Sequence, residues 1–197
     1  KGWEKENKNA YVELARFFAH EGAHLWNGQL FHSSSGDMWM HEGGADAFAY
    51  FALYKLGLVD QQGFSDLQSG AYTNCVSKLK NRPLKDVLED PEFRAHYSCG
   101  AMAALITHVA VKKKNKTQGL FEFWHALFAK VRNQNLKTYD ESMYFSTLSE
   151  MSGNQELANR LQKFINGPIE NPNKFVRTEL ENLGIKFSSL EKNIPVE

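Results

Sequence analysis

The chain has 197 residues, and its 23 acidic and 23 basic side chains give a formal net charge of zero at pH 7. This balance offers no electrostatic basis for a nucleic-acid partner or an anionic membrane surface, and we expect neither. The longest apolar run, around Ala101 to Val111, is interrupted by Thr107 and His108 and is too short to span a bilayer. The length suits one domain of ordinary size, so residues 1–197 are interpreted as a single domain.

The predicted elements are almost all helices. Apolar side chains recur at helical spacing, and no segment shows the period of two that is typical of a strand. Asn27–Gly28 is the predicted stop of the first helix, and Asp37 is the predicted N-cap of the second. The pattern therefore predicts an all-α, bundle-like fold. In chain order, the predicted helices span residues 9–26, 37–56, 65–79, 97–114, 118–133, 140–151, 155–165 and 173–183, with breaks at Gly57, Pro83, Pro91 and Gly184.

The start of the chain and its cysteines bear on the cellular context. The sequence does not begin with Met, and its main motif starts at His20, so we expect it to be part of a longer protein. Any targeting segment would lie outside this sequence, and the compartment stays open, a periplasmic or secreted location included. Cys75 and Cys99 fit either a disulfide bond or two buried thiols, and the sequence does not decide between them.

Residues 20–24 read HEGAH and contain the pattern H-E-x-x-H. Positions four apart lie on one face of a helix, so the imidazoles of His20 and His24 can converge on one metal ion. Glu21 can lie beside that metal without binding it, which is where a general base for a metal-bound water must be. The pattern therefore predicts a Zn²⁺ site with His20 and His24 as ligands and Glu21 as the base.

A zinc site of this kind needs a third protein ligand, and the next predicted helix offers Glu42. The intervening loop is short, so the two helices can pack antiparallel and return Glu42 to the His pair. Asp46 lies one turn after Glu42 on the same face, where its carboxylate can accept the second ring N–H of a ligand His. Residues 9–56 thus supply the zinc-binding helices, and residues 64–197 supply the packing helices.

Each of these residues also has a simpler interpretation. H-E-x-x-H occurs by chance on solvated helix faces, and Glu42 or Asp46 could be an ordinary surface carboxylate. His32 and His41 lie close in sequence to the site. His41 adjoins Glu42, so in a regular helix it points away from the metal, and we interpret both as surface or supporting groups.

The same segments resemble the active site of a class of zinc peptidases. HEGAHLWN at 20–27 and WMHEGG at 39–44 resemble the H-E-x-x-H and W-x-x-E-G segments of the aminopeptidase N and glycyl aminopeptidase families. Both families are gluzincins, the thermolysin-like metallopeptidases, and the spacing of Glu42 and Asp46 also resembles that of thermolysin. The resemblance is strong at the metal site and diffuse elsewhere, and His41 stands where aminopeptidase N often has Asn.

A second segment extends this resemblance. YSCG at 97–100 opens an apolar helix, as the Y-x-x-G of aminopeptidase N-like enzymes does. In that family the Tyr hydroxyl helps to stabilise the tetrahedral intermediate, so the resemblance implies this catalytic role for Tyr97, with His96 as the other candidate donor. The alternative is that the Tyr97 hydroxyl caps a local backbone group.

The resemblance implies zinc-dependent hydrolysis of peptide bonds in a peptide or protein substrate, by the C-terminal part of a thermolysin-like catalytic domain. In gluzincins a β-rich region precedes the first zinc helix and completes the substrate cleft. This sequence does not contain it, so an N-terminal β-rich region of the same protein is an expected partner. Two alternatives stay open: a zinc-binding helical fragment without activity of its own, and hydrolysis of a non-peptide substrate such as a lipid epoxide.

Overall fold

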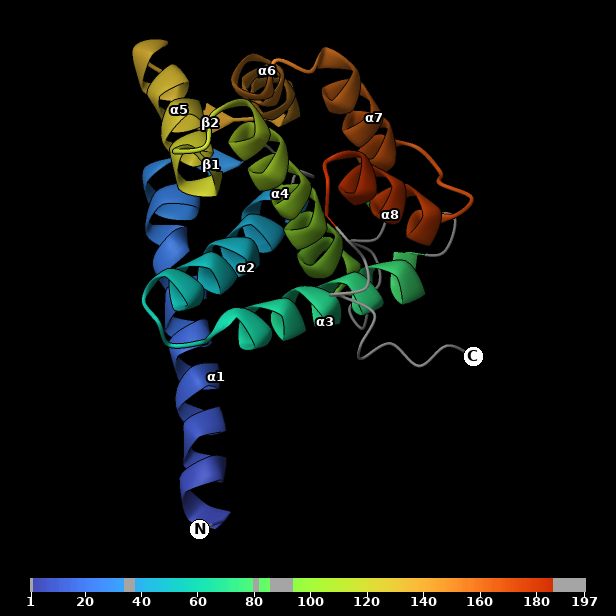
Figure 1. Ribbon diagram of the computed structural model, residues 1–197. Coiled ribbons are helices and arrows are strands. Elements are labelled where there is room, and N and C mark those ends of the chain that lie inside the picture. Colours follow the sequence, from blue (N-terminus) through green and yellow to red (C-terminus); the bar gives the residue numbers. More distant parts are fainter. Residues whose placement is uncertain (1, 34–37, 80–81, 86–93, 186–197) are drawn as a thin grey trace.

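The computed structural model describes residues 2–33, 38–79, 82–85 and 94–185 (Figure 1). Within these ranges the chain is almost entirely helical, which confirms the predicted all-α class. No helix in the described ranges has both the length and the apolar character needed to cross a membrane. In chain order, the elements are α1 (Gly2–His24), the π-helix η1 (Leu25–Leu30), β1 (His32–Ser33), α2 (Met38–Lys55), α3 (Gln61–Leu79), α4 (Ala95–Lys114), α5 (Leu120–Asn133), β2 (Thr138–Tyr139), α6 (Glu141–Ser152), α7 (Gln155–Asn166) and α8 (Pro172–Asn182).

α4 forms the centre of the molecule. α2 and α3 pack against it most closely, and α5, α6 and α8 also contact it (Figure 1). Every residue from Ala101 to Thr107 is buried. A helix that is apolar all round must be covered on all sides, and the buried apolar residues of the other helices form one continuous cluster with it.

α1 and α2 pack antiparallel, as the sequence predicts. His20 of α1 faces Asp46 of α2, while His24, one turn later in α1, faces Glu42, one turn earlier in α2. The N-terminal half of α1 extends past the other helices (Figure 1). The functional side chains therefore come from the C-terminal half of α1, where α2 lies alongside it.

Two glycines allow α2 and α4 to cross with their backbones in contact. A Cβ atom added at Gly43 would collide with the backbone of Gly100, and one added at Gly100 would collide with the carbonyl oxygen of Trp39. Only glycine leaves room for this approach. The crossing brings the first turn of α4, which carries Tyr97, next to Glu42.

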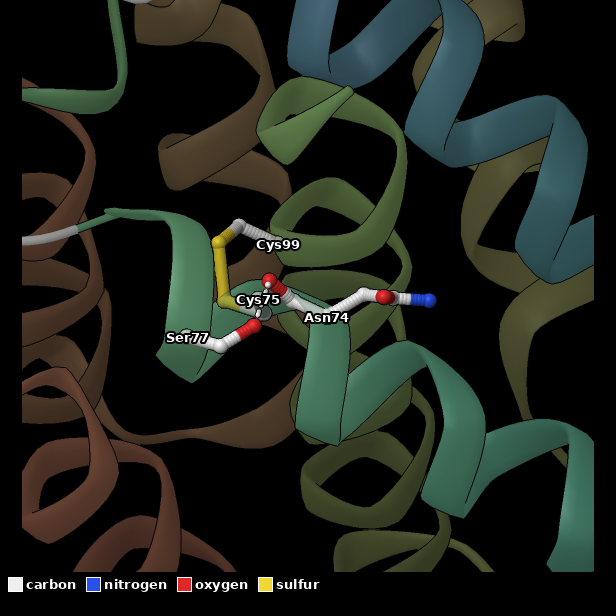
Figure 2. The surroundings of a disulfide bond; sticks show 4 residues. All are labelled: Asn74, Cys75, Ser77 and Cys99. Carbon is white, nitrogen blue, oxygen red and sulfur yellow. Dashed lines mark hydrogen bonds between the residues drawn. A yellow bond between two sulfur atoms is a disulfide. The ribbon is translucent and has the colours of Figure 1, made fainter. Parts of the chain in front are cut away.

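A disulfide bond joins Cys75 of α3 to Cys99 of α4, both fully buried (Figure 2). The sequence leaves the choice between a bond and two thiols open, and the structure has the bond. Nearby, Ser77 Oγ donates to the carbonyl of Asn74 in the same turn of α3. The bond fixes the start of α4 against α3, two residues after Tyr97.

Most predicted helix ends agree with the structure to within a few residues. Gly57 and Gly184 have φ angles of +70° and +96°, the left-handed conformation that favours glycine after a helix. α3 begins at Gln61, four residues before its predicted start. The predicted cap Asp37 and the predicted break at Pro91 lie outside the described residues.

The predicted stop of the first helix at Asn27–Gly28 is wrong. The α-helix ends at His24, and the chain continues through both residues as the wider η1. Asn27 is turned inward and is only 4% exposed, while Gly28 leaves room for a neighbouring ring, since a Cβ there would lie 2.9 Å from His41 Cε1. Tertiary contacts therefore change the winding of the chain where local signals predict its end.

The sequence also predicts no strand, whereas the structure has a minimal parallel pair. His32 aligns with Thr138 and Ser33 with Tyr139. Two residues are too short to show a periodic pattern, so the sequence carries no signal for them. The pairing is held by the buried Tyr139, whose hydroxyl donates to the carbonyl of Asn27 over 2.9 Å.

Candidate metal centre

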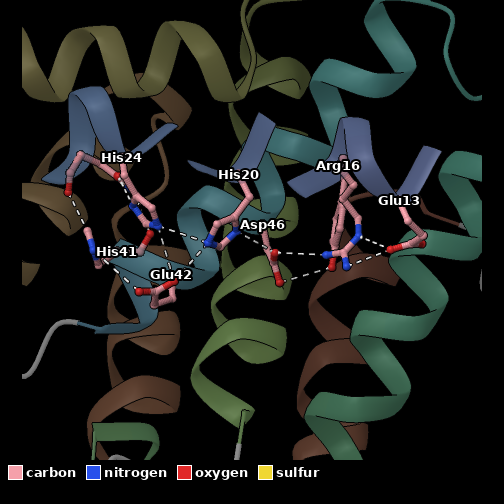
Figure 3. A network of polar contacts seen from close by, with 9 residues as sticks. Glu13, Arg16, His20, His24, His41, Glu42 and Asp46 are labelled. Atoms are coloured by element: carbon pink, nitrogen blue, oxygen red, sulfur yellow. Dashed lines mark hydrogen bonds and ion pairs between the residues drawn. The ribbon is translucent and has the colours of Figure 1, made fainter. Parts of the chain in front are cut away.

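Three side chains converge where α1 and α2 face each other (Figure 3). The Nε2 atom of His20 lies 3.1 Å from Nε2 of His24 and 3.2 Å from Oε2 of Glu42. The same Glu42 oxygen lies 3.6 Å from His24 Nε2. Among the described residues, these three form the cluster of His, Cys, Asp and Glu side chains whose ligand atoms are close enough to hold a metal ion.

The hydrogen bonds behind the imidazoles determine which ring nitrogen carries the proton. His20 Nδ1 lies 2.9 Å from Oδ1 of Asp46, a carboxylate that only accepts, so Nδ1–H donates. His24 Nδ1 lies 3.0 Å from Asn27 Oδ1, and this amide is fixed in orientation because its Nδ2 donates to the carbonyl of His41. In the neutral imidazoles both Nε2 atoms therefore carry lone pairs, directed at each other and at the carboxylate.

Three electron-pair donors this close together repel one another unless positive charge lies between them. In a tetrahedral site with metal–ligand bonds of about 2.0–2.1 Å, neighbouring ligand atoms are roughly 3.4 Å apart. The three observed separations, 3.1, 3.2 and 3.6 Å, surround that value. Two imidazole nitrogens and one carboxylate oxygen thus have the chemistry and the spacing of three protein ligands around one metal ion.

The electrostatics of the cluster also favour positive charge. Burial lowers the pKa of His20, but the hydrogen bonds and charges of Asp46 and Glu42 outweigh it and raise that pKa to about 9. The hydrogen bond with Glu42 raises the pKa of His24 against the opposing effect of burial. Burial raises the pKa of Glu42, but its bonds with His20, His24 and Tyr97 bring it well below its usual range. Protons occupy such a site only until a metal ion displaces them.

Glu21 lies beside the three ligands and does not belong to their cluster. It follows His20 on α1, and its side chain is exposed. Together with His20 and Tyr97 it lines a cleft of about 1000 Å³ between α1, α3 and the start of α4. A carboxylate at the edge of a solvent-filled cleft, adjacent to a metal ligand, can exchange protons with a molecule bound there.

Tyr97 comes from the first turn of α4 and reaches the same cluster. Its ring stacks on the imidazole of His20, with centroids 5.9 Å apart, and its hydroxyl lies close enough to Glu42 to lower the pKa of that carboxyl group. Burial and the negative charge of Glu42 raise the pKa of Tyr97 to about 12, so the phenol is a neutral donor. The structure thus brings Tyr97, the candidate that the resemblance implies, to the cluster of predicted ligands, while Glu21 shares the lining of the cleft with His20.

Asp46 occupies the position predicted for it behind His20. Its carboxylate is only 8% exposed; it also faces Arg16, with Nη1 3.7 Å from Oδ1, and accepts from the hydroxyl of Tyr50 over 3.5 Å. Figure 3 shows this chain of contacts continuing from Arg16 to Glu13 at the edge of the helix. These contacts hold the carboxylate in place, which keeps the His20 ring in one orientation.

His41 does not point away from the site, contrary to the expectation for a regular helix. Its ring packs on that of His24, with centroids 4.3 Å apart, and its Nε2 lies 3.8 Å from Glu42 Oε1. His41 Nδ1 donates to the carbonyl of Asn27 over 2.9 Å, which draws the ring toward η1. His32, by contrast, is exposed in β1, as a surface residue would be.

His96 lies next to Tyr97, with ring centroids 4.6 Å apart. Its Nδ1 is buried and has no hydrogen-bond partner among the described residues, and burial lowers the pKa of the ring, so the ring is neutral. Tyr97, with its hydroxyl directed at Glu42, is therefore the better placed of the two candidate donors.

Asn27 is the functional residue that sequence reasoning missed. In the sequence, Asn27 marks a predicted helix stop and forms part of the resemblance, yet its side chain contacts His24 directly. The spacing of three residues between His24 and Asn27 is compatible with such a contact. Its inward orientation depends on η1, which no local signal predicts.

Comparisons of the chain with protein-family models, with curated proteins and with solved structures found no match. The residues of the site are therefore the basis on which a function can be proposed.

Proposed function

We propose that this chain is the metal-binding helical part of a zinc-dependent hydrolase that cleaves peptide bonds. The observation that carries the proposal is the convergence of His20, His24 and Glu42 at tetrahedral ligand spacing, with Glu21 adjoining His20 in the sequence and lining the same cleft as His20. Ligands alone would suit a structural metal. Hydrolysis also needs a group that transfers protons and a donor to the developing oxyanion, which Glu21 and Tyr97 can supply.

Zinc is the metal that suits these donors best. Two imidazoles and one carboxylate are nitrogen and oxygen ligands, a set found in catalytic zinc sites, and Cys ligands are absent from the cluster. Three protein ligands, unlike the four of structural zinc sites, leave one position for water or substrate. When bound there, zinc would polarise a carbonyl group and acidify a coordinated water.

The chain's own residues would then perform the proton transfers. Glu21 would take a proton from the attacking water and deliver it to the leaving amine as the peptide bond breaks. Tyr97, kept neutral by burial and by Glu42, would donate its O–H to the oxygen that becomes negative. Asp46 would keep the His20 ring oriented while charge changes on the substrate side.

A second candidate function is a zinc-binding module that lacks activity by itself. Leu14, Phe18 and Leu25 are more than half exposed and lie at spacings of three and four residues from one another and from Glu21, along α1 and the start of η1. Exposed apolar side chains on both sides of Glu21 are suited to cover by a further part of the protein. This observation agrees with the β-rich region that the gluzincin resemblance implies, and in that case hydrolysis would require the longer protein.

Elemental analysis of the purified chain, followed by assays with fluorescence-quenched peptides with free and with blocked N-termini, tests both candidates. The expected result is about one zinc per chain and hydrolysis that Glu21→Gln abolishes without loss of zinc. Asp66→Asn is the matched control, because Asp66 is an exposed carboxylate of α3 that lines the same cleft.

Three outcomes separate the candidates. Zinc bound without hydrolysis in the wild-type chain would favour the binding module. Wild-type rates in Glu21→Gln would refute the role of Glu21 as base. Full zinc content in His24→Ala would refute the ligand assignment itself.

A further inference from the structure

Asn27 has more contacts around the candidate metal centre than a helix residue normally makes. Its side-chain oxygen accepts from His24 Nδ1 over 3.0 Å, and its side-chain nitrogen donates to the carbonyl of His41 over 2.9 Å. Its own carbonyl oxygen accepts from His41 Nδ1 and from the Tyr139 hydroxyl, each over 2.9 Å. Side chain and backbone together thus link α1, α2 and the distant segment that contains Tyr139.

The side-chain contact determines the state of a candidate ligand. Because the Asn27 amide is fixed by His41, its oxygen must face His24, and the Nδ1 atom of that ring must carry the hydrogen. The lone pair of His24 is then on Nε2, directed at His20 and Glu42. Asn27 does for His24 what Asp46 does for His20.

The backbone carbonyl of Asn27 holds His41, which lies next to the candidate ligand Glu42. His41, held by the carbonyl of Asn27, packs its ring on His24 and places Nε2 3.8 Å from Glu42 Oε1. The position depends on the π-helical turn, which brings Asn27 inward, and on Gly28, whose missing side chain leaves room for the His41 ring. π-Helical turns of this kind occur often at functional sites.

We propose that Asn27 is a positioning residue of the metal centre, which orients His24 through its side chain and, through its carbonyl group, holds the His41 ring packed against His24. The proposal rests on the proposed metal site. The geometry that points to it is independent of Glu21 and of catalysis: one buried amide, at 4% exposure, is hydrogen-bonded to a ligand ring and to the residue beside another ligand. Partners of this kind behind metal ligands typically change metal affinity 10- to 100-fold when removed.

The test uses Asn27→Leu, which keeps the volume and removes both side-chain hydrogen bonds. Asn27→Ser is the second variant, because its small side chain is too short to reach the ring and leaves space for water, so it folds more readily. Asn27→Asp keeps an acceptor for His24 Nδ1 and loses the donor to His41. Thr107→Val is the matched control, since it removes a buried hydrogen bond, to Tyr144 over 2.8 Å, from a part of the core that does not touch the metal centre.

Zinc affinity is measured by competition with a chelator, and the ligand geometry by the visible absorption spectrum of the cobalt(II)-loaded chain. Thermal unfolding of the metal-free variants gives their stability. We expect Asn27→Leu and Asn27→Ser to bind zinc about 10- to 100-fold more weakly and to change the cobalt spectrum. Asn27→Asp should keep much of the zinc affinity and of the cobalt spectrum of the wild-type chain. Thr107→Val should lower the unfolding temperature and leave zinc affinity and the cobalt spectrum unchanged.

The outcomes separate this inference from the proposed function. A wild-type chain that binds neither zinc nor cobalt would overturn the metal site and this inference with it. A wild-type chain that binds zinc, with Asn27→Ser of equal affinity and unchanged cobalt spectrum, would overturn the inference alone. Weaker zinc binding in Thr107→Val, in proportion to its lost stability, would show that general destabilisation explains the effect.

Discussion

His20 and His24 are oriented by hydrogen bonds from behind, and this support decides what each ligand can do. Asp46 holds one ring and Asn27 the other, so both Nε2 lone pairs face Glu42. A lone imidazole would be free to rotate and to change tautomer, and each such freedom would weaken metal binding. The residues behind the ligands are therefore as important to the site as the H-E-x-x-H pattern itself.

His108 shows the opposite electrostatic behaviour in the core. It packs on Phe51, and its Nδ1 accepts from the backbone N–H of Leu120 over 3.1 Å, which requires the neutral ring. Burial, with Lys112 nearby and only Glu122 opposing, lowers the pKa of His108 to about 4. Between the ordinary pKa of about 6.5 and this value, the unfolded chain binds a proton that the folded chain does not.

The first prediction follows from this difference. As the pH falls from about 6.5 toward 4, protonation of His108 in the unfolded chain should lower the free energy of unfolding. His108→Asn keeps an acceptor near the Nδ1 position and does not titrate, so its stability should fall less over this range. Urea denaturation of both proteins at several pH values measures the effect. Parallel pH profiles for the two proteins would contradict it, whatever their absolute stabilities.

At the scale of elements, the crossing of α2 and α4 positions the site. Gly43 and Gly100 touch through their backbones; Glu42 adjoins Gly43, and Tyr97 lies about one turn before Gly100. The transition from α1 to η1 is equally important, because it places the side chain of Asn27 between His24 and His41. In both places, the position of the site residues depends on the conformation of the backbone and not on one particular side chain.

Gly100→Ala should therefore be strongly destabilising. The added methyl group collides with the carbonyl of Trp39, and forced overpacking of this kind costs about 1–3 kcal/mol. Gly70→Ala is the control, because Gly70 is an exposed residue of α3 with open space around it, where alanine should be neutral or slightly stabilising. Chemical denaturation of both variants measures the difference. Equal stability would show that the helices can separate at little cost.

The disulfide bond between α3 and α4 supports the same region. Cys75 and Cys99 are 24 residues apart, and closing a loop of that length stabilises a protein by about 3 kcal/mol through the entropy of the unfolded chain. The Cys75→Ser/Cys99→Ser double variant should lose a comparable free energy of unfolding. Denaturation of the oxidised, reduced and double-variant proteins tests this. If reduction of the wild type left its stability unchanged, the bond would have no structural role.

At the scale of the whole molecule, the candidate metal centre lies where α1 meets the rest of the bundle. α1 extends past the rest of the bundle and packs mainly against α2, and the three candidate ligands lie across that contact. A metal ion bound there would therefore link α1 to the core. A metal ion that binds only the folded chain raises the free energy of unfolding. The increase is proportional to the logarithm of the ratio of the free metal concentration to the Kd, once that ratio is large.

Zinc should accordingly raise the unfolding temperature. At free zinc 100 times the Kd, the gain is about 2.7 kcal/mol, and removal of the metal with EDTA should reverse it. His24→Ala should show neither the gain nor the loss, because one ligand is missing. Differential scanning calorimetry with and without zinc makes the comparison. An equal increase for His24→Ala would place the bound zinc elsewhere.

The features that the sequence predicts depend on interactions between residues close together in the chain. The features that it does not predict depend on contacts between distant segments. Helical periodicity and glycine stops are local, so the sequence alone determined the all-α class and the ends at Gly57 and Gly184. The spacing of His20 and His24 within one helix is local too, and it was enough to predict these two residues as metal ligands.

Only the tertiary structure decided the rest. The π-helical turn with Asn27, the position of His41 and the pairing of β1 with β2 all depend on contacts between segments far apart in the chain. Local signals at Asn27–Gly28 favour a helix end, and the buried hydrogen bonds of Asn27 with His24 and His41 outweigh them. A buried polar group must find partners wherever the fold supplies them, and the sequence does not state where those partners will be.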